Sequence, residues 1–159
     1  PGQGDPRAEG LAPALSWTSQ VALVKHVPAG EGVGYGLTFR PSANTQVALV
    51  PVGYADGFNR LLSNRGHMLV HGQKAPIIGR VCMDLTMLDV GQIDGVTDGD
   101  EVVIFGTQDG EAFLASELAE LTDTIPYEVI GRFGSSRVLL KPATLDRLLL
   151  RLGLLLRHS

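Results

Sequence analysis

The chain has 159 residues, of which 44% are hydrophobic and 19% are charged, a composition typical of one folded domain with a sizeable core. Its formal net charge of −4 gives no electrostatic reason to expect nucleic acid or an anionic membrane as a partner. No apolar stretch reaches the roughly 18 residues that a membrane-spanning helix requires, and the first residues do not show the pattern of a signal peptide.

Three regions follow one another along the chain. Residues 1–13 are rich in proline and glycine and lack an initiating methionine, so we expect an interdomain linker from a missing upstream domain. Residues 14–141 combine short apolar runs with glycine-rich turns and are expected to form the folded domain. Residues 142–159 form a leucine-rich tail.

Short runs of β-type residues make up most of the folded domain. We expect strands within residues 16–24, 46–52, 67–70, 76–78, 80–90 and 101–105. The run at 80–90 alternates, which places Met83 on one face of the expected strand and Cys82 on the other. Turns are expected at residues 71–74, 98–99 and 109–110. This close spacing of six or more strands is typical of a barrel or a sandwich.

Two segments have the spacing of helices. Leu114, Leu118, Leu121 and Ile125 recur at steps of four, three and four, which predicts a helix around residues 115–123. In the tail, leucines at 145, 148, 149, 152, 155 and 156 lie opposite arginines at 147, 151 and 157, and Thr144 can cap the start of a second helix.

Two tyrosines stand in glycine-rich loops. Residues 30–36 carry glycine at every second position, but they lack the third glycine and the following helix of a dinucleotide-binding loop. The glycines on either side of Tyr35 let other groups approach its phenol, which can shuttle a proton where cationic neighbours stabilise the phenolate. Tyr54 follows the run at 46–52 and is either a second phenol at a strand end or part of a hairpin loop. An ordinary loop tyrosine is the alternative for Tyr35.

Residues 79–84 combine a base, a thiol, a thioether and a carboxylate in the order Gly-Arg-Val-Cys-Met-Asp. A nucleophilic Cys82 would need a nearby histidine, and no local motif supplies one, so a buried structural cysteine is favoured. We expect no metal site, because His67 and His71 on one strand would lie about 13 Å apart. The single cysteine cannot form an internal disulfide and suits a reducing cytoplasm, where we expect the protein to act.

Taken together, the loop motifs resemble those of one enzyme family. The stretches V-G-Y-G at 33–36, G-Y-A-D-G at 53–57, G-Q-K-A-P-I at 72–77, G-R-V-C-M-D at 79–84, D-G-D-E-V at 98–102 and T-I-P-Y-E-V at 124–129 occur in family order. They resemble the C-terminal β-domain of alanine racemases, with Gly34 in place of the usual serine. The resemblance runs from about residue 11 to residue 140. It implies a mainly antiparallel, Greek-key-like β-barrel of about six to nine strands, with two short helices.

The resemblance also implies a function. Such racemases are homodimers that interconvert L-alanine and D-alanine for cell-wall peptidoglycan, and an N-terminal barrel holds pyridoxal 5′-phosphate on a lysine. The C-terminal domain of one subunit closes over the barrel of its partner. No lysine here matches the cofactor lysine, so this chain alone is expected to be inactive.

The family's site residues map onto seven positions of this chain. Tyr35 resembles the tyrosine that exchanges the α-proton, and Met83 resembles the residue whose backbone helps bind the substrate carboxylate. Tyr127 resembles the tyrosine that hydrogen-bonds the cofactor phosphate. The entrance channel would be lined by Tyr54, Arg60, Arg80 and Asp84. The alternatives are a non-catalytic dimerisation or binding module that kept the fold, and an unrelated β-barrel binding module.

Overall fold

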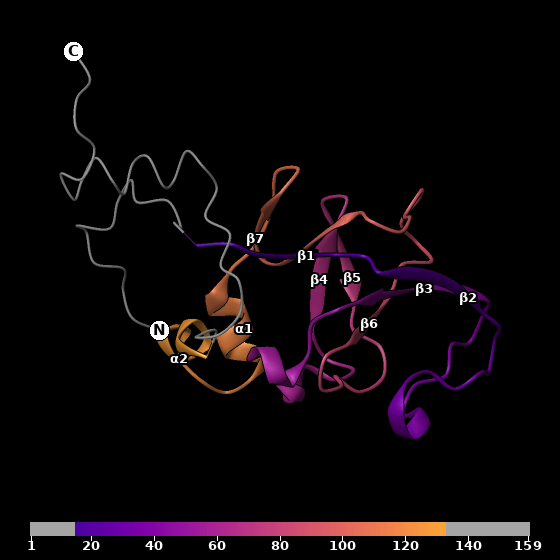
Figure 1. The fold of residues 1–159 in the computed structure, drawn as a ribbon, viewed down its shortest axis with the longest axis horizontal. Coiled ribbons are helices and arrows are strands. Elements are labelled where there is room, and N and C mark those ends of the chain that lie inside the picture. Colours follow the sequence, from indigo (N-terminus) through magenta and orange to yellow (C-terminus); the bar gives the residue numbers. More distant parts are fainter. Residues whose placement is uncertain (1–14, 133–159) are drawn as a thin grey trace, which may run out of the picture.

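The computed structural model describes residues 15–132, which form eight strands and two short helices (Figure 1). The expected linker at 1–13 and the expected tail helix within 142–159 lie outside the described residues. The strands pair in two antiparallel sheets. The first contains β1 (Trp17–Gln20), β4 (His67–Val70), β5 (Gln73–Pro76), β7 (Glu101–Gln108) and β8 (Glu111–Phe113). The second contains β2 (Leu23–Val27), β3 (Thr45–Val50) and β6 (Thr86–Asp89).

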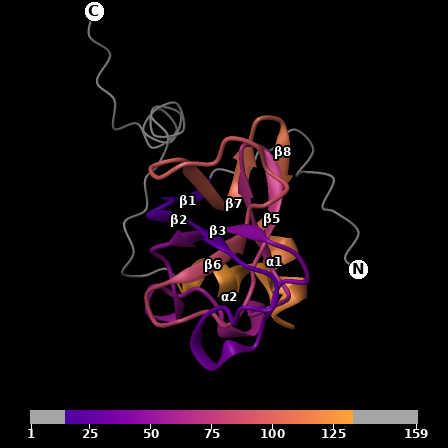
Figure 2. The same ribbon diagram turned by 90° about the vertical axis from the view of Figure 1, so that its right-hand side faces the viewer.

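The two sheets are joined on both sides. Their strand orders are β1-β7-β4-β5, with β8 paired to β7, and β2-β3-β6. On one side β1 runs on towards β2, which follows it along the long axis of the molecule (Figure 1), and Figure 2 looks along that axis. There the Val21 N–H donates to the Asp100 carbonyl and the next N–H, from Ala22, to the Leu49 carbonyl, each at 2.8 Å. On the other side an isolated bridge pairs Ile77 with Leu88. The predicted mainly antiparallel β class is confirmed, but the strand ladders do not close into one continuous barrel.

The tight turns form where the sequence predicts them. His71 and Gly72, between β4 and β5, have φ angles of 49° and 66°. Asp109 and Gly110, between β7 and β8, have φ angles of 50° and 90°. Two successive left-handed residues match the right-handed twist of the flanking strands and set the register of a hairpin.

Three of the predicted strands differ from the structure. The strand expected at 76–78 is observed as β5 at Gln73–Pro76, so the turn expected over 71–74 takes up only residues 71–72. Residues 80–90 do not form one strand, because β6 covers only Thr86–Asp89. Gly79 has a φ of 74°, and the Cys82 N–H donates to the Leu85 carbonyl at 2.9 Å, so residues 80–85 form a loop. The expected run at 16–24 is divided into β1 and β2, because its hydrogen-bond partners change from one sheet to the other at residues 21–22.

The helices lie together at one end of the molecule (Figure 1). The expected helix at 115–123 is observed as α1 (Ala115–Leu121), and its Leu118 and Ala119 are buried. The second helix, α2 (Pro126–Gly131), was not expected from the sequence; it starts on a proline and buries Val129. A core of buried aliphatic and aromatic side chains joins both sheets to α1 and α2.

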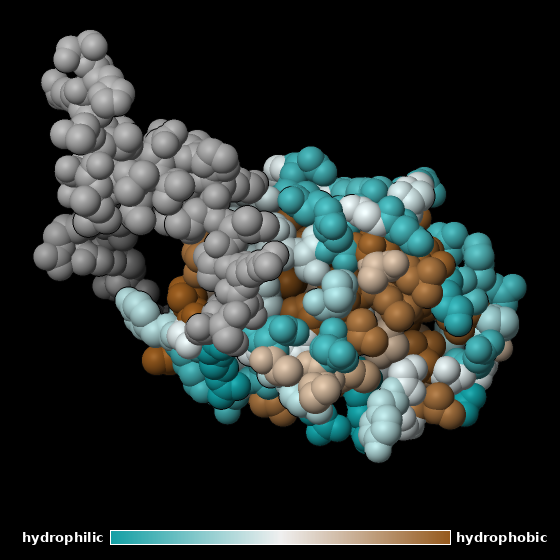
Figure 3. Space-filling view, viewed as in Figure 1, coloured by the Kyte–Doolittle hydropathy of each residue, from teal (hydrophilic) through white to brown (hydrophobic). Residues whose placement is uncertain are grey.

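Apolar side chains also reach the surface. On the face shown in Figure 3 they gather over the middle of the domain, with hydrophilic residues towards its margins. Within residues 15–132, no helix combines the length and the apolar character needed to cross a membrane.

Candidate active site

An open cavity of about 470 Å³ brings together five of the seven residues that the family resemblance singles out. Two tyrosines, two arginines and a methionine contribute to its lining, which consists of Tyr35, Tyr54, Arg60, Arg80, Val81, Cys82 and Met83. These residues come from three loops: residues 33–39, residues 53–62, and residues 79–83. The residues that line the cavity therefore come from the loops that connect strands.

The first loop presents Tyr35 to solvent. Tyr35–Leu37 form a short 3-10 turn, and 72% of Tyr35 is exposed. The φ angles of Gly34 and Gly36 are 70° and 75°, values that glycine adopts without a steric penalty. The loop is anchored at its base, where the Val33 N–H donates to the Phe39 carbonyl at 2.9 Å and the Val33 side chain is buried. A fixed base with an exposed tip is a suitable arrangement for a side chain that must reach a partner molecule.

The second loop lies against the third through backbone contacts. Within Tyr54–Asp56, the Tyr54 N–H donates to the Cys82 carbonyl at 3.0 Å, and the Ala55 N–H donates to the Met83 carbonyl at 2.9 Å. A Cβ atom at Gly53 would lie 2.3 Å from the Cys82 carbonyl oxygen, so only glycine permits this approach. These contacts place Tyr54 beside Met83.

The third loop, residues 79–83, carries Arg80 and Met83 and is also held by two side chains. The Gly79 N–H donates to Asn64 Oδ1 at 2.6 Å, and the Val81 N–H donates to Ser63 Oγ at 3.0 Å. The sequence analysis did not identify Ser63 or Asn64. In the sequence they lie shortly before Gly66, which directly precedes β4, and in the structure the φ of Asn64 is left-handed at 55°.

The exposed groups of the cavity suit a small anionic ligand. The guanidinium of Arg80 lies beside the first loop, since a Cβ atom at Gly36 would be 3.2 Å from its Nη1. Arginine binds carboxylates and phosphates through paired N–H donors, so Arg60 and Arg80 favour anions near the cavity. Met83 is 55% exposed, and within residues 15–132 its N–H has no hydrogen-bond acceptor. The Cys82 thiol donates to the Arg80 carbonyl at 3.5 Å, and no histidine lines the cavity.

Two of the seven residues lie outside the cavity lining. Asp84 is exposed immediately after Met83, beyond the lining residues. Tyr127 lies on α2 and is 83% exposed. Figure 1 shows α2 at the opposite end of the long axis from the indigo loop that follows β2 and contains Tyr35. The structure therefore does not bring Tyr127 to the cavity.

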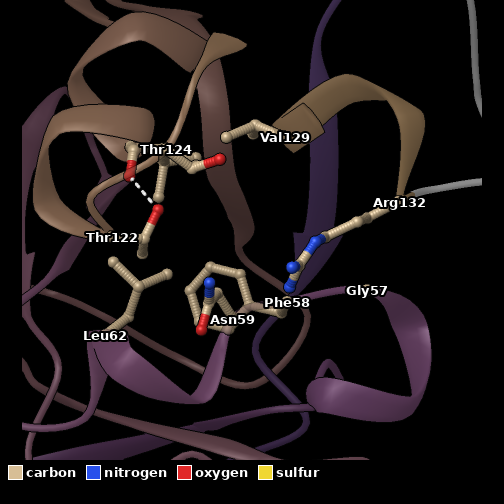
Figure 4. A pocket seen from close by; sticks show the side chains of 9 residues that line it. Gly57, Phe58, Asn59, Leu62, Thr122, Thr124, Val129 and Arg132 are labelled. Atoms are coloured by element: carbon tan, nitrogen blue, oxygen red, sulfur yellow. Dashed lines mark hydrogen bonds between the residues drawn. The ribbon is translucent and has the colours of Figure 1, made fainter. Parts of the chain in front are cut away.

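The helices support the second loop from behind. A small cavity of about 20 Å³, room for roughly one water molecule, lies between Phe58 and Leu62 on one side and Thr122 and Val129 on the other (Figure 4). Phe58 and Leu62 are buried, and the Thr122 hydroxyl donates to the Leu118 carbonyl at 2.8 Å. Tyr54 and Arg60 are thus carried by a segment whose apolar side chains pack into the core.

Comparisons with known proteins show the family of the chain. Residues 14–139 match the family described as "Alanine racemase, C-terminal domain". The alanine racemase of Cutibacterium acnes is 54% identical over 119 residues, which cover 75% of this chain and 32% of that protein. The chain thus spans about a third of the length of the curated relatives it matches.

Solved structures give the same result. The alanine racemase of Streptomyces coelicolor A3(2) is 40% identical with a TM-score of 0.76, over 83% of this chain and 34% of that one. The Bartonella henselae alanine racemase with covalently bound pyridoxal phosphate is 31% identical with a TM-score of 0.70, over 76% and 33%. The matched family, the level of identity and the shared fold together show that this chain belongs to the alanine racemase C-terminal domains.

Proposed function

We propose that this chain is the C-terminal half-site of a pyridoxal-phosphate-dependent alanine racemase, which interconverts L-alanine and D-alanine in the cytoplasm to supply peptidoglycan synthesis. The observation that carries the proposal is the joint exposure of Tyr35 and Met83 in one cavity with two arginines. A proton donor can exchange the α-proton of an amino acid, and a free backbone N–H and cationic side chains can bind its carboxylate.

The described residues fit a chain that completes a cofactor site and does not itself hold the cofactor. The cavity lining contains no lysine, and the described lysines, Lys25 and Lys74, lie on β2 and β5 outside it. When bound by the barrel, pyridoxal phosphate delocalises the negative charge left by removal of the α-proton. The exposed hydroxyl of Tyr127 would donate a hydrogen bond to its phosphate.

Each exposed group of the cavity has a role in this proposal. The Tyr35 hydroxyl exchanges the α-proton on one face of the substrate, while the free N–H of Met83 binds the substrate carboxylate. Tyr54, Arg60 and Arg80 line the cavity and would form the entrance channel, with the exposed Asp84 beyond them. There the two guanidiniums attract the carboxylate of an incoming amino acid.

The proposed partner is the N-terminal barrel of a second subunit, in a homodimer. Tyr35 and Tyr127 lie at opposite ends of the described domain, so they would serve different sites. Tyr127 would contact the cofactor of its own subunit, and Tyr35 would contact the cofactor of the partner. Exposed Tyr35, Leu37 and Met83 have the aromatic and methionine character that is enriched in interface cores.

The test joins this chain to the barrel domain of a racemase relative and measures racemisation in both directions. Activity is expected, and Tyr35→Phe should lower kcat by roughly 10²–10⁴-fold, the usual effect of losing a positioned acid–base group. Thr107→Val, which removes an exposed hydroxyl from β7, is the matched control and should retain activity. A joined protein that is folded but inactive would favour the non-catalytic module, and a loss below about threefold in Tyr35→Phe would exclude the proposed role of Tyr35.

A further inference from the structure

We infer that Asn64 is a positioning residue that fixes the Tyr35 loop relative to the Arg80–Met83 loop, and this inference rests on the proposed function. The observation is a double contact made by one amide side chain. Asn64 Oδ1 accepts the Gly79 N–H at 2.6 Å, and Asn64 Nδ2 donates to Thr38 Oγ1 at 3.3 Å. Gly79 directly precedes Arg80, and Thr38 ends the turn that carries Tyr35.

The backbone of Asn64 directs this side chain. Its φ of 55° is left-handed, a conformation that asparagine tolerates better than most other residues with a side chain. The turn around it is fixed on both sides, because the Ser63 N–H donates to the Arg60 carbonyl at 3.2 Å and the Arg65 N–H to the Leu62 carbonyl at 3.0 Å. Leu62 is itself buried against the core. The backbone of Asn64 is therefore held in place, and its side chain makes both contacts from a fixed position.

At their bases the two loops pack against each other, since a Cβ atom at Gly79 would lie 3.0 Å from the Val33 carbonyl oxygen. Asn64 adds a contact further along the Tyr35 loop, at Thr38. The tip of the Tyr35 loop is exposed, and the residues from Tyr35 to Thr38 lie at the surface. Residues 80–83 do not belong to any strand. Arg80 beside Gly36 adds another contact between these loops, but its long side chain is only partly buried. The Asn64 amide is shorter, has fewer rotatable bonds, and so fixes the separation more closely.

This placement has a consequence for catalysis. In the proposed function the hydroxyl of Tyr35 and the N–H of Met83 act on one small substrate, so their separation must be set closely. Ser63 fixes only the Arg80–Met83 loop, through the Val81 N–H. Asn64 contacts both loops, and its loss should change the rate of proton transfer more than the affinity for substrate.

The test separates the two contacts of Asn64. Thr38→Val removes the hydrogen bond from Asn64 Nδ2 and leaves the Gly79 contact in place, while Asn64→Gly removes both contacts and still adopts the left-handed backbone. In the chain joined to a racemase barrel, each variant should lower kcat roughly tenfold and leave KM within about threefold. The double variant should be no slower than Asn64→Gly alone, and Thr38→Ser should retain the wild-type kcat.

Asn44→Gly is the matched control. Asn44 Oδ1 accepts the Ala29 N–H at 3.0 Å in a loop that does not line the cavity, so the same substitution there should leave kcat unchanged. A second readout needs no barrel: NMR of the chain itself should show the Tyr35 ring resonances shifting in Asn64→Gly and in Thr38→Val. The Gly79 amide should stay protected from hydrogen exchange in Thr38→Val and lose protection in Asn64→Gly.

The outcomes distinguish this inference from the proposed function. If the joined wild-type protein lacks racemase activity, the proposed function fails, and the Tyr35 resonances alone decide whether Asn64 positions the loop. If that protein is active, unchanged Tyr35 resonances or an unchanged kcat in Thr38→Val would overturn the inference. Additive losses in the double variant would also overturn it.

Discussion

The terminal methyl group of Met87 occupies the space that a side chain at position 34 would need. A Cβ atom on Gly34 would lie 2.7 Å from Met87 Cε, and the backbone there has φ of 70° and ψ of −173°. This conformation is essentially confined to glycine. The chain carries glycine at position 34, and Met87 packs against the loop at that place.

Gly34→Ser should therefore destabilise the domain, by about 1–3 kcal/mol in free energy of unfolding. Both the left-handed backbone and the contact with Met87 oppose the new side chain. Urea unfolding of the two proteins measures the difference. Gly95→Ser is the control, because Gly95 has a φ of 72° and a Cβ atom added there would meet nothing within 4 Å. Equal losses at the two positions would show that Met87 contributes nothing.

Gly53→Ala tests the contact between the second and third loops. The added Cβ atom would lie 2.3 Å from the Cys82 carbonyl oxygen and 2.4 Å from the Met83 carbonyl carbon, so backbone has to move against backbone. We expect a loss of about 3 kcal/mol in free energy of unfolding. Gly131→Ala, with open space around the new atom at the end of α2, should cost nothing. Wild-type stability in Gly53→Ala would contradict the close approach of the two loops.

His67 should make the stability of the domain depend on pH. Burial lowers the pKa of His67 below its usual 6.5, the charge of Lys74 lowers it further, and Glu117 opposes both. The Nε2 atom is buried without a hydrogen-bond partner among the described residues, and the ring packs on Phe113 with centroids 4.0 Å apart. The unfolded chain therefore takes up a proton at a higher pH than the folded chain does. Stability should fall as the pH decreases through 6.5.

Urea unfolding midpoints measured between pH 7.5 and pH 5.5 check this expectation. His67→Leu should flatten the profile, and Lys74→Gln should reduce its slope, because one of the two causes of the lowered pKa is removed. A midpoint that rises on acidification, or a Lys74→Gln profile steeper than that of the wild type, would show that the pKa of His67 is not lowered by folding.

The chain alone should not racemise alanine. The described lysines lie outside the cavity, and the barrel that would carry the cofactor is not part of the matched domain. Incubation of the purified chain with pyridoxal phosphate and L-alanine, followed by chiral chromatography, should detect no D-alanine. D-alanine formed by the pure chain would contradict the half-site proposal.

The features that follow from local chemistry could be predicted from the sequence. The β4–β5 turn needs two residues that accept a positive φ, and His71-Gly72 lies between two β-type runs. Helix α1 follows from the recurrence of Leu114, Leu118 and Leu121, which packs one face on the core. Helix α2 was missed because it has only six residues and one buried side chain, too few for a periodic pattern.

The other differences come from contacts over long distances in sequence. The alternation at 80–90 predicted one strand, but Ser63, Asn64 and the backbone at 53–55 take up the polar groups of residues 79–83. No sequence pattern encodes these partners, which lie 15, 18 and 28 residues away. Family resemblance identified Tyr35, Tyr54 and Met83. Asn64 could be identified only from the structure, where its side chain bonds to both Thr38 and Gly79.

The way residues 79–83 are held has a consequence for sequence variation. Their backbone polar groups bond to Ser63, Asn64 and the 53–55 turn, while Arg80 and Met83 line the open cavity. Substitution of those two side chains does not touch the bonds that keep the loop in place. The loop can therefore change its surface chemistry with little loss of stability, and libraries aimed at substrate range should be randomised at 80 and 83 with 63 and 64 kept constant.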